Sequence, residues 1–464
     1  MVNTEVAELI SLATQMMRDR RRVLVLDDDP TGSQTASGAP VVTDFSPESI
    51  TWLLRNATPT GFVLTNSRSL DAAATRAMTR DILQTANRAA TDLGVDLSFL
   101  SRSDSTLRGH FPLDVTLINE LVPTGKSRLV VVCPAYPAAG RITRDGLHLV
   151  RSGENWVPVG ETSFAKDATF GFSSSTLPEW VEERSAGEWR AADVAVISLS
   201  DIRRGADHVG RLLRRHASPT GSIPVCVDAE TEADLDTIAE ALESAEKSGV
   251  TTIVQCGPSL ARARGGLQHS RRLSPADLAR SMDSTSDAHG LVVVGSHVGL
   301  TTAQLAKADK LDGIVTIELP SAELIDTDRR SSVIESVIRR CTDALAKSDV
   351  VLRTSRAVTT GRDAAESLSI AAQIAEALST VTRAVITARE PKWIIAKGGI
   401  TSSDVITKVL RMTRARVLGP ILDGIVPVWI DQSRSGPLCV VFPGNVGDPD
   451  SLRDVITTLR EVSR

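Results

Sequence analysis

The sequence predicts an α/β protein of two domains, each built on a mainly parallel sheet flanked by helices. Strand-like runs of β-branched residues and Leu alternate with long segments of helical periodicity through most of the chain. The length of 464 residues exceeds the roughly 250–300 residues at which one hydrophobic core stops growing. Polar clusters follow several strand-like runs, at the edge where open parallel sheets bind ligands.

The first half of the chain carries the first series of elements. Between the strand-like runs lie two long helical segments, Leu70–Leu93 and Glu232–Ser248. Each is followed by a glycine, Gly94 or Gly249, where a left-handed residue favours the end of a helix. The expected strands are Val23–Leu26, Gly61–Leu64, Asp96–Leu100, Leu129–Val132, Val194–Ile197, Ile223–Val227 and Thr252–Val254.

A polar, Arg- and Ser-rich stretch from Arg262 to His289, containing Gly265-Gly266 and Pro275, breaks this rhythm. It predicts a domain boundary, with domains at 1–270 and 285–464. The region 151–190 holds three of the six Trp residues and little periodicity, so it is expected to be an insertion or cap. The second domain is expected to contain the strands Leu291–Val294, Gly313–Ile317, Val350–Arg353, Trp393–Ala396 and Leu438–Phe442.

The composition excludes several classes of protein. A hydrophobic content of 42% and a charged content of 23% are those of an ordinary globular protein. The net charge of −5 argues against a nucleic-acid partner. No apolar run is long enough for a membrane span and no signal-peptide core is seen, which predicts a cytoplasmic protein. The five Cys are scattered and form neither a disulfide framework nor a zinc motif.

The densest cluster of acidic residues is Asp27-Asp28-Asp29-Pro30-Thr31-Gly32, directly behind the run Val23–Leu26. Adjacent carboxylates at the end of a buried strand repel one another, so a substrate hydroxyl, Mg²⁺ or a transferred proton is expected to use them. A solvated acidic turn is the alternative interpretation.

A second polar cluster, Ser101–His110, follows the strand-like run that ends at Leu100. Its hydroxyls, carboxylate and two guanidiniums suit a polyhydroxylated, negatively charged small molecule. Arg68 and Arg141 follow neighbouring strand-like runs in the same way. An N-capping loop with a surface salt bridge is the structural alternative.

The second half carries Gly-rich loops behind its strands. Gly398-Gly399-Ile400-Thr401-Ser402 opens an amphipathic segment, and glycines at a helix amino terminus let backbone amides approach a phosphate. Gly295-Ser296 and Gly444-Asn445-Val446-Gly447 follow other strands, so the three loops together suggest a nucleotide cradle. Each loop alone is equally explained by capping.

From about Val23 to Gly447, the chain resembles the four-carbon acid sugar kinase family. The resemblance rests on Asp28, Asp29, Thr31 and Gly32; Ser67-Arg68; Asp104-Ser105-Thr106-Leu107-Arg108-Gly109; Cys133-Pro134-Ala135-Tyr136 with Gly140-Arg141; Val294-Gly295-Ser296 with Thr301 and Gln304; and Gly398-Gly399-Ile400-Thr401-Ser402. The ordered box Asp104–Gly109 is the most specific of these motifs.

The chain departs from the family pattern at two places. Phe442-Pro443 stands where the family usually has Lys-Ser before Gly-Asn, and Ile425-Val426-Pro427 after Asp423-Gly424 replaces a Pro-Gly-Val-Pro turn. Lys397, next to Gly398, is a hypothetical source of the missing charge.

The resemblance implies a transferase: an ATP-dependent kinase for the terminal hydroxyl of a four-carbon sugar acid. It implies a sugar-acid domain and an ATP domain, with the active site in the cleft between them and Mg²⁺ bridging the phosphates. The expected catalytic residues are Asp28, Asp29 and Asp104. The expected substrate-binding residues are Arg68, Arg102, Ser103, Asp104, Ser105, Thr106 and Arg108, with Arg68, Arg102 and Arg108 holding the substrate carboxylate. The expected ATP-binding residues are Ser296, Gly398, Gly399, Ile400, Thr401, Gly444 and Asn445.

Two other functions remain open at this point. Asp27-x-Asp29-x-Thr31 also fits a haloacid-dehalogenase-like phosphatase, with Asp27 as nucleophile and Asp29 as acid/base, although no lysine sits in a convincing loop for it. A sensor that binds sugar acid and ATP without turnover is the third interpretation. The sequence identifies neither the metal ligands nor the individual sugar acid, and a homodimer is expected only as the commonest oligomer.

Overall fold

The structure is a computed structural model that describes residues 21–29, 37–122, 125–221, 223–267, 271–282, 288–357, 359, 361–362, 364–422, 425–433 and 436–463. Pro30, Thr31, Gly32, Asp423 and Gly424, named in the sequence analysis, lie outside these residues. The chain divides into two compact units: Met1–Gly32 with Ala39–His269, and Ser33–Gly38 with Ser270–Arg464. The cleft expected between them stays a prediction.

The first unit is built on a parallel sheet with the strand order β2-β3-β1-β4-β11-β5-β10-β9. Its strands are β1 (Arg21–Asp27), β2 (Pro40–Val42), β3 (Thr60–Leu64), β4 (Asp96–Arg102), β5 (Arg128–Cys133), β9 (Ala195–Ile197), β10 (Val225–Val227) and β11 (Thr251–Cys256). Each strand predicted for this half forms. The three-residue β2 was missed because it is too short to show periodicity.

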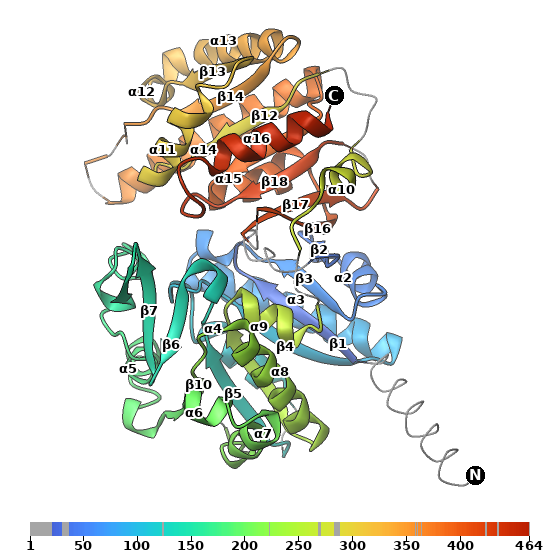
Figure 1. Cartoon of the computed structure of the whole chain (residues 1–464), viewed down its shortest axis with the longest axis vertical. Helices are drawn as coiled ribbons and strands as arrows, with labels where there is room; N and C mark the ends of the chain where they lie inside the picture. The colour runs from blue at the N-terminus through green and yellow to red at the C-terminus, as the bar shows by residue number, and fades with distance from the viewer. Residues whose placement is uncertain are drawn as a thin grey trace. The chain divides into compact units, whose positions relative to one another are not determined.

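Helices flank this sheet (Figure 1). They are α2 (Pro47–Leu54), α3 (Ala72–Leu93), α4 (Leu113–Leu121), α5 (Leu177–Arg184), α6 (Leu199–Ile202), α7 (Ala206–Arg215), α8 (Glu232–Lys247) and α9 (Pro258–Arg264). Helix α3 begins where the Asp71 carboxylate accepts a hydrogen bond from the Ala74 amide, and it ends at Gly94 with a φ of 62°. The two long predicted helices therefore form within two residues of their expected ends.

Region 151–190 contributes to a small layer beside the main sheet. The antiparallel order is β6-β7-β8, formed by Arg141–Arg144, Leu147–Ser152 and Asn155–Pro158. Trp180 of α5 is 2% exposed, and its ring lies 4.6 Å from that of Phe111. The tryptophans that broke the sequence periodicity thus include one that anchors this region to the core of the first unit.

The second unit has the strand order β13-β14-β12-β15-β18-β17-β16, in which β17 is antiparallel to both β18 and β16 and the other pairs are parallel. Its strands are β12 (Leu291–Val294), β13 (Ile314–Leu319), β14 (Asp349–Thr354), β15 (Trp393–Lys397), β16 (Arg414–Leu422), β17 (Val426–Asp431) and β18 (Leu438–Phe442). The β16–β17 pair was not predicted, because Pro420 and Pro427 argue against strands in a sequence.

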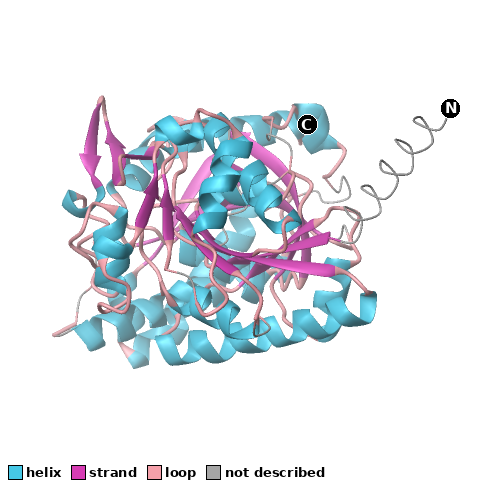
Figure 2. Ribbon diagram, turned by 90° about the horizontal axis from the view of Figure 1, so that it is seen from below, coloured by secondary structure: helices cyan, strands magenta, loops and turns pink. Residues whose placement is uncertain are grey.

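The helices of the second unit are α10 (Pro275–Ala279), α11 (Gly299–Ala308), α12 (Ser321–Ile325), α13 (Thr327–Leu345), α14 (Ala364–Ala388), α15 (Gly399–Asp404) and α16 (Ser451–Val462), with a π-helical turn at Val405–Val409. Figure 2 shows helices around the strands throughout the molecule. Both units are therefore α/β, as predicted. No helix within the described ranges is long and apolar enough to cross a membrane.

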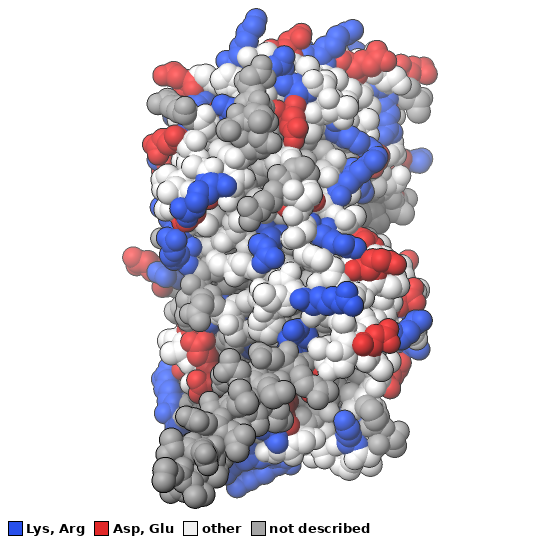
Figure 3. Space-filling view, turned by 90° about the vertical axis from the view of Figure 1, so that its right-hand side faces the viewer, with Lys and Arg blue, Asp and Glu red and all other residues white. Residues whose placement is uncertain are grey.

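Charged side chains of both signs are interspersed on the face drawn in Figure 3.

Candidate active site

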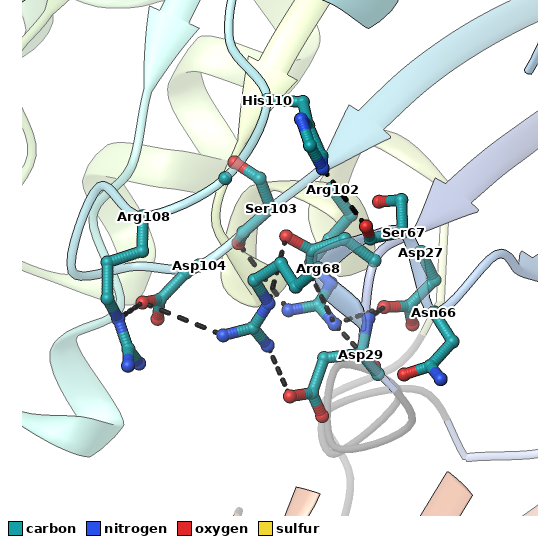
Figure 4. A network of polar contacts seen from close by, with 12 residues as sticks. Asp27, Asp29, Asn66, Ser67, Arg68, Arg102, Ser103, Asp104, Arg108 and His110 are labelled. Carbon is teal, nitrogen blue, oxygen red and sulfur yellow. Dashed lines mark hydrogen bonds and ion pairs between the residues drawn. The ribbon is translucent and has the colours of Figure 1, made fainter. Parts of the chain in front are cut away.

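The carboxyl ends of β1, β3 and β4 bring the predicted polar clusters of the first unit together. In the sheet register, Asp27 at the end of β1 lies between Leu64 of β3 and Arg102 of β4. The segments that follow these strands therefore meet at one edge, as the sequence predicted. Figure 4 shows the resulting network of carboxylates and guanidiniums.

Two arginines pair with the outer two of the three consecutive aspartates. Arg102 forms an ion pair with the Asp27 carboxylate, and its Nη2 also donates to the main-chain oxygen of Asp29 at 2.6 Å. Arg68 forms an ion pair with the Asp29 carboxylate. The crowding of acids is thus compensated inside the chain by partners from neighbouring strands.

Asp28 differs from the aspartates on either side of it. Its Oδ2 lies 3.3 Å from Nε of Arg68 and its Oδ1 lies 3.6 Å from Nη2 of Arg102. Neither oxygen has a hydrogen-bond partner among the described residues, although both are buried. Burial raises the pKa of Asp28 to about 6, against the lowering effect of the two arginines. Asp28 is therefore a carboxylate with free acceptor sites and a pKa suited to taking up a proton.

Asp104 is suited to a different task. Its Oδ2 accepts hydrogen bonds from Oγ1 of Thr106 at 2.5 Å and from Nε of Arg108 at 2.6 Å. Burial alone would raise its pKa, but Arg108, Arg68 and the Thr106 hydroxyl together hold the pKa of Asp104 well below its ordinary value. Asp104 stays ionised and anchors this loop, which makes it a poor proton acceptor.

Asp27 does not suit the nucleophile of a phosphatase. Its side chain is 2% exposed and is paired with Arg102. Burial raises the pKa of Asp27 to about 7. A nucleophilic carboxylate must be ionised and reach the substrate, so this geometry argues against the phosphatase alternative.

The loop after β4 is held close to Asp28 by contacts from several distant segments. Gly109 has a φ of 136°, and a Cβ there would lie 3.5 Å from Oδ2 of Asp28. Nε2 of His110 lies 3.0 Å from the carbonyl oxygen of Ser67, and Nε2 of His148 lies 2.8 Å from that of Ser105. Ser103 accepts a hydrogen bond from Gln255 on β11.

Region 151–190 reaches the same loop. The Arg108 guanidinium lies 5.1 Å from the centre of the Phe164 ring, and its Nη1 lies 3.6 Å from Oδ2 of Asp167. Nη2 of Arg184 donates to the carbonyl oxygen of Gly109 at 3.0 Å. Sequence reasoning did not assign Phe164, Asp167 or Arg184 to the site, because no motif marks them.

In the second unit, the three predicted Gly-rich loops converge. A Cβ on Gly444 would lie 2.5 Å from Oγ of Ser296, and one on Gly398 would lie 3.1 Å from Cβ of Ser296. A Cβ on Gly295 would lie 2.4 Å from Oγ1 of Thr401. Three loops from separate strands therefore pack so closely that a Cβ at Gly444 or Gly295 would displace the facing side chain of Ser296 or Thr401.

Two side chains of α11 fix the loop after β18. Oγ1 of Thr301 donates to the carbonyl oxygen of Gly444 at 2.9 Å. Nε2 of Gln304 donates to the carbonyl oxygens of Val446 and Asp448 at 3.1 and 2.8 Å. Asn445 itself is exposed, so this loop presents both its backbone and the Asn445 side chain.

A cavity of about 210 Å³ opens beside these loops. Its lining is mainly apolar and includes Gly295, His297, Leu378, Ile400, Thr401 and Asp404. Ile400 is 65% exposed, so its side chain is accessible at the mouth of this cavity. Ile400 and Thr401, both predicted to bind ATP, lie on this lining.

Lys397 contacts one of these loops but does not present at their surface the charge hypothesised from the sequence. Its side chain is fully buried, its Nζ donates to the carbonyl oxygen of Pro443 at 2.7 Å, and its Nζ lies 3.8 Å from the centre of the Phe442 ring. Adjacency to Gly398 misled the prediction, because the side chain at the end of β15 turns into the core. The hydrogen bond from Lys397 to Pro443 stabilises the backbone of the loop after β18.

The buried Lys397 predicts a specific pH dependence of stability. Burial lowers the pKa of Lys397 from 10.5 to about 6. The unfolded chain therefore binds more protons than the folded chain between those values, so stability rises with pH across this window. Thermal unfolding at pH 6.5 and 9 should show the wild type gaining stability relative to Lys397→Met. Parallel pH dependences in the two proteins would contradict this.

Comparison with known families covers both units. Residues 23–264 match the family model described as a sugar-binding N-terminal domain, and residues 291–452 match the one described as a nucleotide-binding C-terminal domain. The chain belongs to the four-carbon acid sugar kinase family. We refer to the matched segments as the sugar-binding and nucleotide-binding domains.

Curated relatives carry related names. The chain is 29% identical over 253 residues to a D-threonate kinase of Salmonella typhimurium, covering 54% of this chain and 53% of the relative. It is 28% identical over 306 residues to a D-erythronate kinase of Heliobacterium modesticaldum, covering 62% of each. The chain thus spans between about half and three fifths of the length of these relatives.

Solved structures share the fold of this chain. A protein of Salmonella typhimurium described as a putative tRNA synthase is 17% identical, with a TM-score of 0.68 over 93% of this chain and 98% of that one. A Haemophilus influenzae protein is also 17% identical, with a TM-score of 0.62 over the same shares of the two chains. At this identity the likeness shows the fold alone.

Proposed function

We propose that this protein is an ATP-dependent kinase that phosphorylates the terminal hydroxyl of a four-carbon sugar acid, a tetronate or 3-oxo-tetronate. The observation that carries the proposal is the buried Asp28 carboxylate at the end of β1, whose oxygens accept no hydrogen bond from any described residue. Its place in a sugar-binding domain, followed by a nucleotide-binding domain, supports this choice of reaction.

In the proposed reaction, Asp28 accepts the proton of the sugar-acid hydroxyl. The hydroxyl oxygen forms a bond to the γ-phosphorus of ATP as the bond from that phosphorus to the β,γ-bridging oxygen breaks, which releases ADP. Phosphoryl transfer depends mainly on alignment and neutralisation of charge. Arg68 and Arg102 keep Asp28 in place, while Asp29 and Asp104 hold Arg68 in turn.

For the nucleotide, we propose that the loops of Ser296, Gly398 and Gly444 receive the phosphates through backbone amides and hydroxyls. Gly399 and Thr401 at the start of α15 and the exposed Asn445 extend this surface. The apolar cavity beside Ile400 has the character expected for a nucleotide base.

Mg²⁺ enters the proposal as a partner of the phosphates. Within the described residues, no group of three or more His, Cys, Asp or Glu side chains could hold a metal ion. We therefore propose that the magnesium ion is bound mainly by oxygen atoms of ATP and by water. When bound, the ion would neutralise charge on the transferred phosphoryl group.

The test is a coupled measurement of ADP release with Mg-ATP across a panel of four-carbon sugar acids, beside hydrolysis of p-nitrophenyl phosphate. ADP release that depends on one acid would support the kinase and identify its substrate. Ester hydrolysis without ADP release would favour the phosphatase. Binding of acid and ATP with no turnover would favour a sensor. The cytoplasmic location and the homodimer expected from the sequence stay predictions.

A further inference from the structure

Arg141 is a buried cation of the sugar-binding domain that the proposed reaction leaves without a task. Its side chain is 9% exposed. Nη1 donates to the carbonyl oxygen of Ala139 at 2.5 Å, and Nε is buried without a hydrogen-bond partner. Among the described residues, no carboxylate oxygen forms an ion pair with Arg141, and a buried charge without a counter-ion is costly.

The three arginines that the sequence predicted to hold the substrate carboxylate already have carboxylate partners. Arg68 contacts Asp28, Asp29 and Asp104. Arg102 contacts Asp27 and Asp28. Arg108 contacts Asp104 and Asp167. If these three arginines held the substrate carboxylate, each would have to leave a carboxylate of the chain. Arg141 has no carboxylate partner among the described residues and would lose none.

The small sheet turns Arg141 toward the loop that carries Asp104. Arg141 and Thr143 are two residues apart on β6, so their side chains leave the strand on the same face. Oγ1 of Thr143 lies 2.9 Å from Nδ1 of His148, and Nε2 of His148 lies 2.8 Å from the carbonyl oxygen of Ser105. Through these two contacts the face of β6 that carries Arg141 and Thr143 lies against Ser105, which is next to Asp104.

Asp104, Tyr136 and Arg108 are the titratable groups that affect the pKa of Arg141. Burial lowers the pKa of Arg141, Asp104 and Tyr136 act in the opposite direction, and Arg108 lowers it further. Arg141 also lowers the pKa of His148, which burial holds near 4 and therefore uncharged at neutral pH. Asp104 is the one carboxylate among these neighbours, and Arg108 and Arg68 already compensate it.

We infer that Arg141 binds the carboxylate of the sugar acid and so selects acids over uncharged polyols. The inference rests on the proposed function for the class of ligand. A guanidinium can bind a carboxylate through two parallel hydrogen bonds, and the unpartnered Nε of Arg141 is one of the donors this requires. The bound carboxylate would supply the counter-charge that none of the described residues provides through an ion pair.

The experiment compares Arg141→Gln with the wild type, using isothermal titration with D-threonate and with D-erythronate, each beside the tetritol of the same configuration. We expect the variant to bind the acid at least about tenfold more weakly and to lose a similar factor in its preference for acid over tetritol. Its ADP affinity should not change. An unchanged preference would overturn the inference.

Arg144→Gln is the matched control, because Arg144 lies on the same strand but is exposed and paired with Glu230. It removes the same charge and should leave acid binding unchanged. Should Arg141→Gln not fold, Arg141→Lys carries the test, since it keeps the charge without the planar fork. Several-fold weaker acid binding in Arg141→Lys would support the inference, and wild-type affinity would overturn it.

These titrations also separate the inference from the proposed function. Acid binding that depends on Arg141 in a protein that does not consume ATP would leave the inference standing and reject the kinase. Kinase activity with the same KM for the acid in Arg141→Gln and in the wild type would support the kinase and overturn the inference.

Discussion

Asp28→Asn is expected to lower kcat by about 100- to 10,000-fold, the usual contribution of a positioned general base. The asparagine keeps the shape of the side chain but cannot accept the hydroxyl proton. Asp28 is the aspartate of the triplet whose buried oxygens have no hydrogen-bond partner among the described residues. The KM for ATP should change little, because the nucleotide loops belong to the other unit.

The pH profile gives this prediction a second measurement. The pKa of Asp28 is raised to about 6, so kcat/KM of the wild type should fall below pH 6 as the carboxylate becomes protonated. A raised carboxyl pKa also means that the folded state favours the protonated form. The contribution of Asp28 to stability is therefore lost as pH rises through 6. At pH 7.5, Asp28→Asn should melt no lower than the wild type.

Asp29→Asn is the matched comparison for Asp28→Asn. The Asp29 carboxylate is paired with Arg68, so its loss should loosen Arg68 and reduce activity less than the loss of Asp28. In Asp29→Asn, kcat/KM should still fall below pH 6, as it does in the wild type. If Asp29→Asn abolished that limb and Asp28→Asn did not, Asp29 would be the base.

Gly444→Ala is expected to weaken ADP binding by about tenfold to 100-fold, the factor that corresponds to roughly 1–3 kcal/mol of overpacking. The new Cβ would lie 2.5 Å from Oγ and 3.2 Å from Cβ of Ser296. The φ of Gly444 is not positive, so its backbone accepts alanine and the effect is steric. The methyl group would force the loops after β12 and β18 apart, just where the phosphates are proposed to bind.

Gly299→Ala is the matched control, since a Cβ at Gly299 has no atom within 4 Å. It should change ADP affinity by no more than about twofold, as for substitutions that touch nothing. Titration with ADP measures both variants, and titration with the sugar acid should give wild-type affinity in each. Wild-type ADP affinity in Gly444→Ala would show that these loops do not form the phosphate site.

Much of the fold could be predicted because the relevant signals are local. Runs such as Val23–Leu26 and Leu291–Val294 consist of residues that suit buried parallel strands, and both form strands. Gly94 ends α3 because a left-handed residue is needed there. The β16–β17 pair could not be predicted, because Pro420 and Pro427 argue against strands in the sequence. In the structure the two prolines lie opposite each other in the antiparallel pair.

For the candidate site, the sequence by itself determined which residue types follow the strands: aspartates and arginines in the first half and Gly-rich loops in the second. Only the tertiary structure decided which of these groups are already engaged. Asp27 and Arg102 are 75 residues apart in the chain and form an ion pair, while Arg141 is buried without one. Lys397 likewise turns into the core rather than toward Gly398. Ionic pairing and burial depend on residues that are distant in sequence. No local pattern could therefore show that, among the described residues, the Asp28 oxygens have no hydrogen-bond partner and Arg141 has no carboxylate partner.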